Sequence, residues 1–237
     1  EVDLRISILP TKHNERVVMR ILSKEAGEKK LDELGFEKND LAKLNKAITS
    51  PQGMVIVTGP TGSGKTTTLY SILKTISNPS INILTAEDPV EFEMEGIGQV
   101  AIREDIDYTF DVALRSFLRQ DPEVILIGEM RDKKTIDTAL KASLTGHLVF
   151  STLHTNNALG SIIRLLDMET PNYLISSALS LVVAQRLVRR LCPECKIIDD
   201  KINLKILNLI GIDSSQSSRA RIYKSKGCNH CNQSGHK

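Results

Sequence analysis

The sequence contains no tryptophan, only 4 % aromatic residues and only four cysteines in 237 residues. It also lacks a strong excess of one charge, since 31 basic and 29 acidic residues give a formal net charge of +2. Dedicated nucleic-acid binders usually carry a basic excess and an aromatic-rich basic stripe, so this composition disfavours that class. Apolar and charged contents of 41 % and 25 % are ordinary for a globular protein. The length allows one large domain with a small appendage.

Long hydrophobic runs are missing as well. The most apolar stretch, which we expect to be helical, covers residues 175–184. A bilayer-spanning helix needs roughly 20 apolar residues, so we expect a soluble or peripheral protein. There is no signal peptide, and the chain begins with Glu1 rather than methionine, so we expect it to be part of a longer protein.

The four cysteines form two C-x-x-C pairs, Cys192 with Cys195 and Cys228 with Cys231. In an intracellular protein this spacing favours a metal over disulfides. Four thiolates complete a tetrahedral zinc shell with no open position, which is the pattern of a structural site. His230 is an alternative ligand. A redox role is less favoured, because it would place a C-x-x-C pair near the start of a βαβ unit and these pairs lie far from one.

The order of predicted elements indicates an α/β fold. Residues 2–9 and 16–22 predict a hairpin, and the polar residues 23–30 predict a linker. Beyond them, short apolar runs alternate with amphipathic helices, which predicts βαβ units around a mostly parallel sheet. The predicted strands cover residues 54–58, 81–86, 124–128 and 148–153, and the predicted helices cover 40–48, 110–119 and 135–144, with a further helix carrying Leu69, Ile72, Leu73 and Ile76 on one face.

The stretch GPTGSGKTTTLY, residues 59–70, fits the phosphate-binding pattern G-x-x-x-x-G-K-[ST]. It follows an apolar strand and opens an apolar-faced helix, which is the context that this pattern requires. Backbone N–H groups and the helix N-terminus would cradle the triphosphate, Lys65 would reach its β- and γ-phosphates, and Thr66 would ligate Mg²⁺. The residues expected to bind ATP here are Gly59, Pro60, Thr61, Gly62, Ser63, Gly64, Lys65, Thr66 and Thr67.

Three further predicted strands end in residues capable of chemistry, and ligands bind at this edge of open α/β sheets. Glu129 follows the strand VILI at a Walker B-like position, with Gly128 where an aspartate is usual. Glu87 and Asp88 offer a second pair of carboxylates, and a simple turn at Glu87–Asp88–Pro89 is the alternative. A carboxylate that positions the attacking water is typical of phosphoryl transfer, and the sequence does not divide this role between Glu87 and Glu129. His154 is either a sensor of the γ-phosphate or a structural residue.

Five arginines stand out by position: Arg5, Arg20, Arg115, Arg119 and Arg131. Arg115 and Arg119 are four residues apart and share a helical face, whereas Arg5 and Arg20 lie on the predicted hairpin. Arginines supplied by a neighbouring subunit accelerate phosphoryl transfer, but ordinary surface ion pairs are the alternative.

Several motifs occur in an order that resembles the type II secretion and type IV pilus assembly ATPases of the GspE/PilB type. The motifs are VDLRISILP…NERVVMRIL from the end of a preceding domain, the Walker A stretch already quoted, the Asp box TAEDPVEF, the Walker B region LRSFLRQDPEVILIGEMRD, the His box TGHLVFSTLHTN and the insert CPEC…CNHC. The Gly128 of the Walker B strand is usual in this family, whereas Asn14 stands in the hairpin turn where glycine is usual.

The resemblance implies a RecA-like P-loop NTPase with a tetracysteine zinc insert and the tail of a preceding α+β domain. The expected divisions are 1–22 for that N2-type tail, 23–30 for the linker, 31–191 for the ATPase core and 192–237 for the zinc subdomain, which stops before the family's last helices. Glu129 matches the catalytic glutamate and His154 the His box. The five arginines match residues that line the nucleotide site, with Arg5 and Arg20 contacting ATP from the preceding domain.

The resemblance also implies a homo-hexamer at the cytoplasmic face of the bacterial inner membrane. There ATP hydrolysis would drive a membrane platform protein, with a cytoplasmic-domain adaptor, to build a pseudopilus or pilus. No nucleic acid is expected as a partner. Two alternatives remain, a RecA-like nucleic-acid motor and a nucleotide-gated binding module with little hydrolysis. Secretion, pilus assembly and DNA uptake use the same motor, so the sequence does not distinguish among them.

Overall fold

The computed structural model describes residues 3–22, 29–199, 207, 209 and 221–237, so most of the predicted linker lies outside the described residues. The chain divides into two compact units, Glu1–Arg186 and Leu187–Lys237. Within the described residues, no helix is both long enough and apolar enough to cross a membrane.

The predicted N-terminal hairpin is confirmed. Strands β1 (Asp3–Pro10) and β2 (Glu15–Leu22) pair antiparallel, and the register sets Arg5 opposite Arg20. Because side chains alternate along a strand, one face of the hairpin is wholly apolar over six positions. These six side chains are all about half exposed or more: Leu4, Ile6, Ile8, Val17, Met19 and Ile21.

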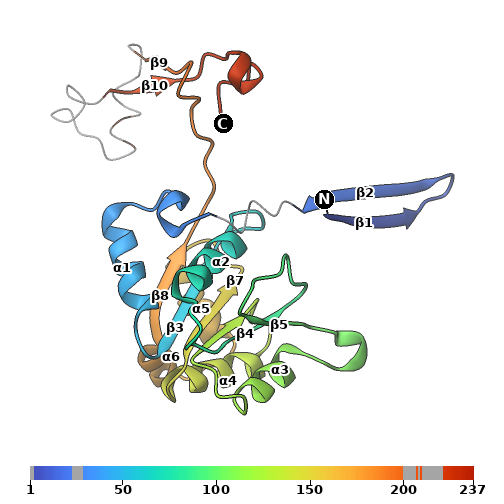
Figure 1. Ribbon diagram of the computed structural model, residues 1–237, viewed down its shortest axis with the longest axis vertical. Helices are drawn as coiled ribbons and strands as arrows, with labels where there is room; N and C mark the ends of the chain where they lie inside the picture. The colour runs from blue at the N-terminus through green and yellow to red at the C-terminus, as the bar shows by residue number, and fades with distance from the viewer. Residues whose placement is uncertain (1–2, 23–28, 200–206, 208, 210–220) are drawn as a thin grey trace. The chain divides into compact units, whose positions relative to one another are not determined.

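The rest of the first unit is built around a six-stranded sheet in the order β5-β4-β6-β7-β3-β8 (Figure 1). Every strand pairs parallel with its neighbours, which confirms the predicted α/β fold. The strands are β3 (Gly53–Thr58), β4 (Ile83–Glu87), β5 (Gly98–Ala101), β6 (Val124–Ile127), β7 (Leu148–Leu153) and β8 (Leu179–Ala184). The helices are η2 (Leu31–Leu34), α1 (Lys38–Ile48), α2 (Lys65–Ile76), η3 (Glu104–Ile106), α3 (Phe110–Phe117), α4 (Lys133–Leu144), α5 (Ala158–Asp167) and α6 (Asn172–Ala178).

The central strands are apolar on both faces because helices cover both sides of the sheet. In β3, Met54 and Ile56 belong to a core with α3, α4 and α6, whereas Val55 and Val57 face a second core with α1 and α2. Each fully buried aliphatic side chain stabilises the folded state by about 1.5–3 kcal/mol relative to an exposed one. A continuous apolar run is therefore what a strand in the middle of this sheet requires.

Polar caps start the helices that follow the strands. The Thr109 side chain accepts the Val112 N–H and begins α3, and the Asp132 carboxylate accepts the Thr135 N–H and begins α4. Asn157 does the same for α5 through the Gly160 N–H. Such caps satisfy backbone donors that have no intrahelical partner, so they define where each helix leaves the sheet edge.

The prediction of one apolar helix over residues 175–184 is wrong. Helix α6 ends at Ala178, and β8 begins at Leu179 and pairs parallel with β3. Tertiary pairing decides this region because β3 offers an open ladder edge, which the β-branched Val182 and Val183 favour. The short strand β5 at the other edge of the sheet is also absent from the sequence predictions.

The second unit contains β9 (Ile197–Ile198), β10 (Tyr223–Lys224) and η4 (Asn229–Cys231) among its described residues. The strands β9 and β10 form a short antiparallel pair. Its buried cluster consists of Cys192, Cys195 and Cys231, with Cys228 packed against them. This cluster takes the place of the aliphatic core that a small unit otherwise needs.

Candidate functional site

The strand order sets the carboxyl ends of β4, β6, β7, β3 and β8 next to one another. Glu87 ends β4, Glu129 follows β6, His154 follows β7 and the Gly-rich loop follows β3. The sheet therefore brings to one edge the side chains that the sequence placed at separate strand ends. This edge is the usual binding site of open α/β sheets.

The Gly-rich loop leaves β3 through Gly59, whose φ of +147° is rare for other residues. A side chain there would also have no room, because a Cβ would lie 2.4 Å from the carbonyl oxygen of Gln185. The loop ends at Gly64, which is left-handed at φ +86° and directly precedes α2. The glycines at both ends let the loop turn tightly and place the first N–H groups of α2 at its centre.

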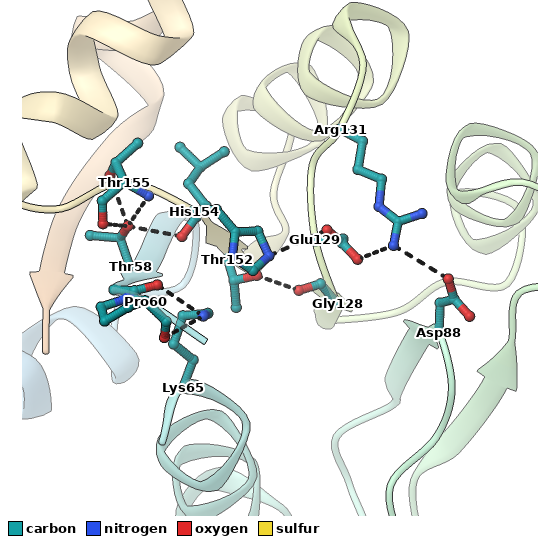
Figure 2. Close-up of polar contacts among 12 residues, drawn as sticks. Thr58, Pro60, Lys65, Asp88, Gly128, Glu129, Arg131, Thr152, His154 and Thr155 are labelled. Atoms are coloured by element: carbon teal, nitrogen blue, oxygen red, sulfur yellow. Dashed lines mark hydrogen bonds and ion pairs between the residues drawn. The ribbon is translucent and has the colours of Figure 1, made fainter. Parts of the chain in front are cut away.

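Lys65 lies over this loop and donates from Nζ to the Gly59 carbonyl at 3.0 Å and to the Pro60 carbonyl at 3.3 Å (Figure 2). Burial lowers the pKa of Lys65, and the negative charge of Glu129 opposes that shift. The ammonium group is thus held at the loop by carbonyl oxygens that an anionic ligand can replace. Thr66 in the first turn of α2 is exposed and available as a hydroxyl ligand.

Glu129 is the centre of a charged cluster (Figure 2). Its Oε1 lies 2.5 Å from Nη2 of Arg131, and its Oε2 lies 3.5 Å from Nε2 of His154. Arg131 also contacts Asp88 at 3.4 Å and Glu104 at 3.5 Å. The hydrogen bond to Glu129 raises the pKa of Arg131, so the guanidinium stays charged. The predicted Glu129, His154 and Arg131 therefore lie together, and Asp88 joins them.

Glu87 has a different environment although it ends the neighbouring strand. Its side chain is buried and accepts hydrogen bonds from the hydroxyl of Tyr70, from Thr85 Oγ1 at 2.5 Å and from Gln99 Nε2 at 3.3 Å. Burial and the contact with Glu87 raise the pKa of Tyr70. This carboxylate ties β4 to α2 and β5, whereas Glu129 contacts the charged side chains of the sheet edge.

Hydroxyl groups fix the loops between these residues. The Thr58 hydroxyl, at the end of β3, contacts the Leu153 carbonyl at 2.8 Å and accepts the Thr155 N–H at 3.0 Å, which ties the Gly-rich loop to the His154 loop. Thr152 donates to the Gly128 carbonyl at 2.7 Å (Figure 2). A Cβ on Gly128 would lie 3.2 Å from the Ala86 carbonyl, so this Walker B position has little room for the usual aspartate.

The other predicted arginines have local contacts. Arg115 pairs with Asp111 at 2.9 Å, and Arg119 donates to the Arg115 carbonyl at 2.8 Å. Arg5 and Arg20 are direct cross-strand neighbours on the hairpin. Their roles at a nucleotide stay predictions.

Sequence reasoning did not identify Tyr70, Thr58 and Gln185. None of them belongs to a chemical pattern that spacing reveals, because their partners are far away in the chain. The Tyr70 hydroxyl meets Glu87, Thr58 meets the loop after β7, and Gln185 meets the Gly-rich loop. Only the end of the motif, LY in GPTGSGKTTTLY, could have drawn attention to Tyr70.

In the second unit the four predicted cysteines come together. Their sulfur atoms all lie within 4.8 Å of one another. Three of the contacts are 3.7 Å, 3.8 Å and 4.0 Å long. Tetrahedral zinc at about 2.3 Å from each sulfur requires S···S separations of about 3.8 Å, so the cluster fits that metal. Backbone N–H groups of Cys228 and Gly235 also point at the Cys231 sulfur, 3.3 Å and 3.2 Å away, as they would for a thiolate.

The parallel sheet, the Gly-rich loop before α2 and the acidic residue after β6 define the chain as a P-loop protein with a RecA-like fold. Comparisons with known proteins give the family. Residues 1–237 match the family described as "Type II/IV secretion system protein". The chain belongs to this family, the type II secretion and type IV pilus assembly ATPases.

Two curated relatives align over the whole chain. The type IV pilus assembly ATPase PilB of Myxococcus xanthus (strain DK1622) is 49% identical over 237 residues. The type II secretion system protein E of Pseudomonas aeruginosa (strain PAO1) is 47% identical over 237 residues. The chain spans 42% of the first relative's length and 47% of the second's.

Solved structures of similar proteins share the fold. The crystal structure of the pilus retraction motor PilT with bound ADP has a TM-score of 0.67 and 34% identity, and the match covers 91% of this chain and 63% of PilT. The ATPase DotB of Legionella pneumophila has a TM-score of 0.63 and 28% identity, and its match covers 79% of this chain and 54% of DotB.

Proposed function

We propose that this chain is the ATP-hydrolysing part of a hexameric motor that powers assembly of a type II secretion pseudopilus or a type IV pilus. The observation that carries the proposal is the meeting of Lys65, Glu129, His154 and Arg131 at one sheet edge. A partly buried carboxylate held by two basic side chains, beside a loop built for phosphates, suits hydrolysis of a phosphoanhydride. The names and identities of the relatives support the choice of motor.

The residues present fit ATP with Mg²⁺. Lys65 would leave the Gly59 and Pro60 carbonyls for the β- and γ-phosphates, and the exposed Thr66 hydroxyl would hold Mg²⁺. Mg²⁺, when bound, would supply positive charge that neutralises the phosphates during hydrolysis. Glu129 would orient the attacking water and take its proton at Oε2, which faces His154. Arg131 holds the other carboxylate oxygen, so the glutamate keeps one defined orientation.

Glu87 contributes to catalysis indirectly in this proposal. Its buried carboxylate is occupied by Tyr70, Thr85 and Gln99, so it positions Asp88, the next residue, toward Arg131. Arg115 and Arg119 are proposed to act on nucleotide in a neighbouring subunit. Both side chains are exposed to solvent. Within one copy of the chain, they contact only nearby residues of their own helix region.

The hairpin supports the proposal that residues 1–22 belong to a larger, preceding domain. A two-stranded hairpin with an exposed apolar face is only marginally stable by itself. On its other face Arg5 lies opposite Arg20, and directly opposed like charges are unfavourable without an anion. A nucleotide phosphate is the anion that we propose for this pair.

The four cysteines are proposed to hold a structural zinc ion, and the division into an ATPase core of residues 31–191 and a zinc subdomain of residues 192–237 remains part of the proposal. The whole motor is proposed to work at the cytoplasmic face of the inner membrane with a platform protein and an adaptor. The similarity to the relatives is what supports these partners, and no contact within this chain is used as support.

The test is Mg²⁺-dependent phosphate release from ATP by the chain across a range of protein concentrations, compared with Lys65→Ala and Glu129→Gln. We expect turnover that rises with assembly, loss of nucleotide binding in Lys65→Ala, and binding without turnover in Glu129→Gln. Strong stimulation by single-stranded DNA would instead favour a nucleic-acid motor. Turnover no faster than that of Glu129→Gln would favour a nucleotide-gated binding module.

A further inference from the structure

Gln185 directly follows β8 and makes three hydrogen bonds to the Gly-rich loop and its flanks. Its backbone N–H donates to the Thr58 carbonyl at 2.9 Å. Its side-chain Nε2 donates to the Ser63 carbonyl at 2.6 Å, and its Oε1 accepts from Thr68 Oγ1 at 2.9 Å. The partners lie more than 100 residues earlier in the chain, with separations of 122 and 117 residues for the two side-chain bonds. Tertiary pairing of β8 with β3 creates these contacts.

The chemistry of the partners sets the orientation of this amide. A backbone carbonyl only accepts, so the nitrogen of the Gln185 amide must face Ser63. The oxygen must then face Thr68, whose hydroxyl donates to it. One planar group therefore joins the last part of the loop to the first turn of α2, and the side chain has no alternative arrangement that keeps both bonds.

Holding the Ser63 carbonyl also orients the following N–H group. The Ser63–Gly64 peptide is planar and trans, so its C=O and N–H point in opposite directions. With the carbonyl directed at Gln185, the Gly64 N–H is directed away from Gln185. An N–H at the start of a helix is a donor for anions, so the amide of Gln185 determines which way one of these donors faces.

Gln185 also lies against the beginning of the loop. A Cβ on Gly59 would be 2.4 Å from the Gln185 carbonyl oxygen, so the two backbones are in close approach. The next residue, Arg186, donates from Nη2 to the Asn156 carbonyl at 3.1 Å, in the loop that follows His154. The end of β8 thus contacts both loops of the candidate site.

We infer that Gln185 is a positioning residue that holds the phosphate loop in its nucleotide-binding shape. This inference rests on the proposed function, because it assigns the residue to the proposed ATP site. Gln185 does not contact phosphate; it acts through Ser63, Gly64 and Thr68. Nucleotide affinity should therefore depend on an amide that lies outside the Gly-rich motif, at the opposite end of the core sequence.

The experiment measures Kd and stoichiometry for MgATP and MgADP by calorimetric titration of the chain, of Gln185→Leu and of Gln185→Glu. We expect Kd for both nucleotides to rise at least about tenfold in Gln185→Leu, because this change removes both side-chain hydrogen bonds and the loss of one bond alone corresponds to up to about tenfold. In Gln185→Glu the rise should be larger, because a carboxylate would face the Ser63 carbonyl and add negative charge beside the phosphates. Thr68→Val, which removes one bond only, should show the smallest rise.

The control is Gln52→Leu, the same change at an exposed residue. Gln52 lies just before β3, at the amino ends of the strands and so away from the candidate site. It should bind as the wild type does. A purely structural role of Gln185 would lower the binding stoichiometry as molecules unfold and leave Kd of the folded molecules unchanged. Wild-type Kd values in Gln185→Glu and Thr68→Val would overturn the inference alone. A wild-type chain that binds neither nucleotide would overturn the proposed function as well.

Discussion

Nη2 of Arg131 lies 2.5 Å from Oε1 of Glu129, two residues away along the loop that follows β6. The pair is asymmetric in exposure, since 19 % of the Glu129 side chain and 50 % of the Arg131 side chain is accessible. The carboxylate is thus held at the sheet edge by a guanidinium that solvent and ligands can reach. Arg131 contacts three acidic side chains, those of Glu129, Asp88 and Glu104, and the contact with Glu129 is the shortest, so its removal should affect Glu129 most.

We expect Arg131→Ala to lower the rate of ATP turnover at saturating MgATP by roughly 10²-fold, the usual effect of removing one preorganised donor. KM should change little, because Lys65 and the loop make the main phosphate contacts. Steady-state phosphate release measures both quantities. Arg103→Ala is the control, because Arg103 is exposed and pairs with Asp105 instead. Equal rates in the two variants would contradict this role for Arg131.

The buried Tyr70–Glu87 contact predicts a distinct dependence on alkaline pH. Burial and Glu87 raise the pKa of Tyr70, so the folded protein holds this proton more tightly than the unfolded chain. The stabilisation is complete below the unfolded tyrosine pKa of about 10 and is lost as pH rises above it, by up to about 1.4 kcal/mol per pH unit. Tyr70→Phe should be less stable near neutral pH by about 1–3 kcal/mol, because Glu87 loses a donor.

Denaturant unfolding between pH 8 and pH 11 checks this prediction. The difference in unfolding free energy between the wild type and Tyr70→Phe should shrink above pH 10. Tyr173→Phe is the matched control, since Tyr173 is 72% exposed, and it should follow the wild-type curve. Parallel curves for all three proteins would show that Tyr70 ionises normally.

Thr58 is predicted to couple the Gly-rich loop to the His154 loop. Thr58→Val keeps the shape of the side chain but leaves the Thr155 N–H without its acceptor, so we expect a loss of about 1–3 kcal/mol in unfolding free energy. ATP turnover should fall as well, because the His154 loop loses its anchor on β3. Thr145→Val is the control, because the Thr145 hydroxyl donates only within its own helix end. Unchanged turnover in Thr58→Val would reject the coupling.

Metal removal should affect the stability of the second unit and leave nucleotide binding by the first unit unchanged. We expect about one zinc ion per chain by elemental analysis, and we expect a strong chelator to make the unit Leu187–Lys237 sensitive to protease. Cys192→Ser should have the same effect. Nucleotide affinity should stay within about twofold of the untreated protein, because the P-loop and Glu129 belong to the other unit. Loss of nucleotide binding after chelation would contradict a purely structural site.

The sequence was sufficient for most of the sheet and for the residues at its edge. Strands β3, β4, β6 and β7 are short, largely apolar runs between helical patterns, so their composition and length identify them without tertiary information. The Gly-rich loop and the paired cysteines have fixed spacings that only a few kinds of chemistry require. Glu129 and His154 were found because each directly follows such a strand.

Elements and contacts that depend on distant partners were not predictable. Residues 179–184 continue an apolar helical pattern in the sequence, and they form β8 only because β3 offers them a hydrogen-bonding edge. Glu87 and Glu129 look equivalent along the chain, yet burial under Tyr70 separates them.

The amino-acid sequence by itself thus determined the α/β class, the phosphate loop, the four-cysteine cluster and the family resemblance, because these depend on local periodicity and short spacings. The tertiary structure alone decided which carboxylate meets Arg131 and His154 and which one is buried. It also decided that Gln185, 122 residues beyond Ser63, supports the loop. The physical reason is that strand order, which no local pattern encodes, brings distant residues within hydrogen-bonding distance.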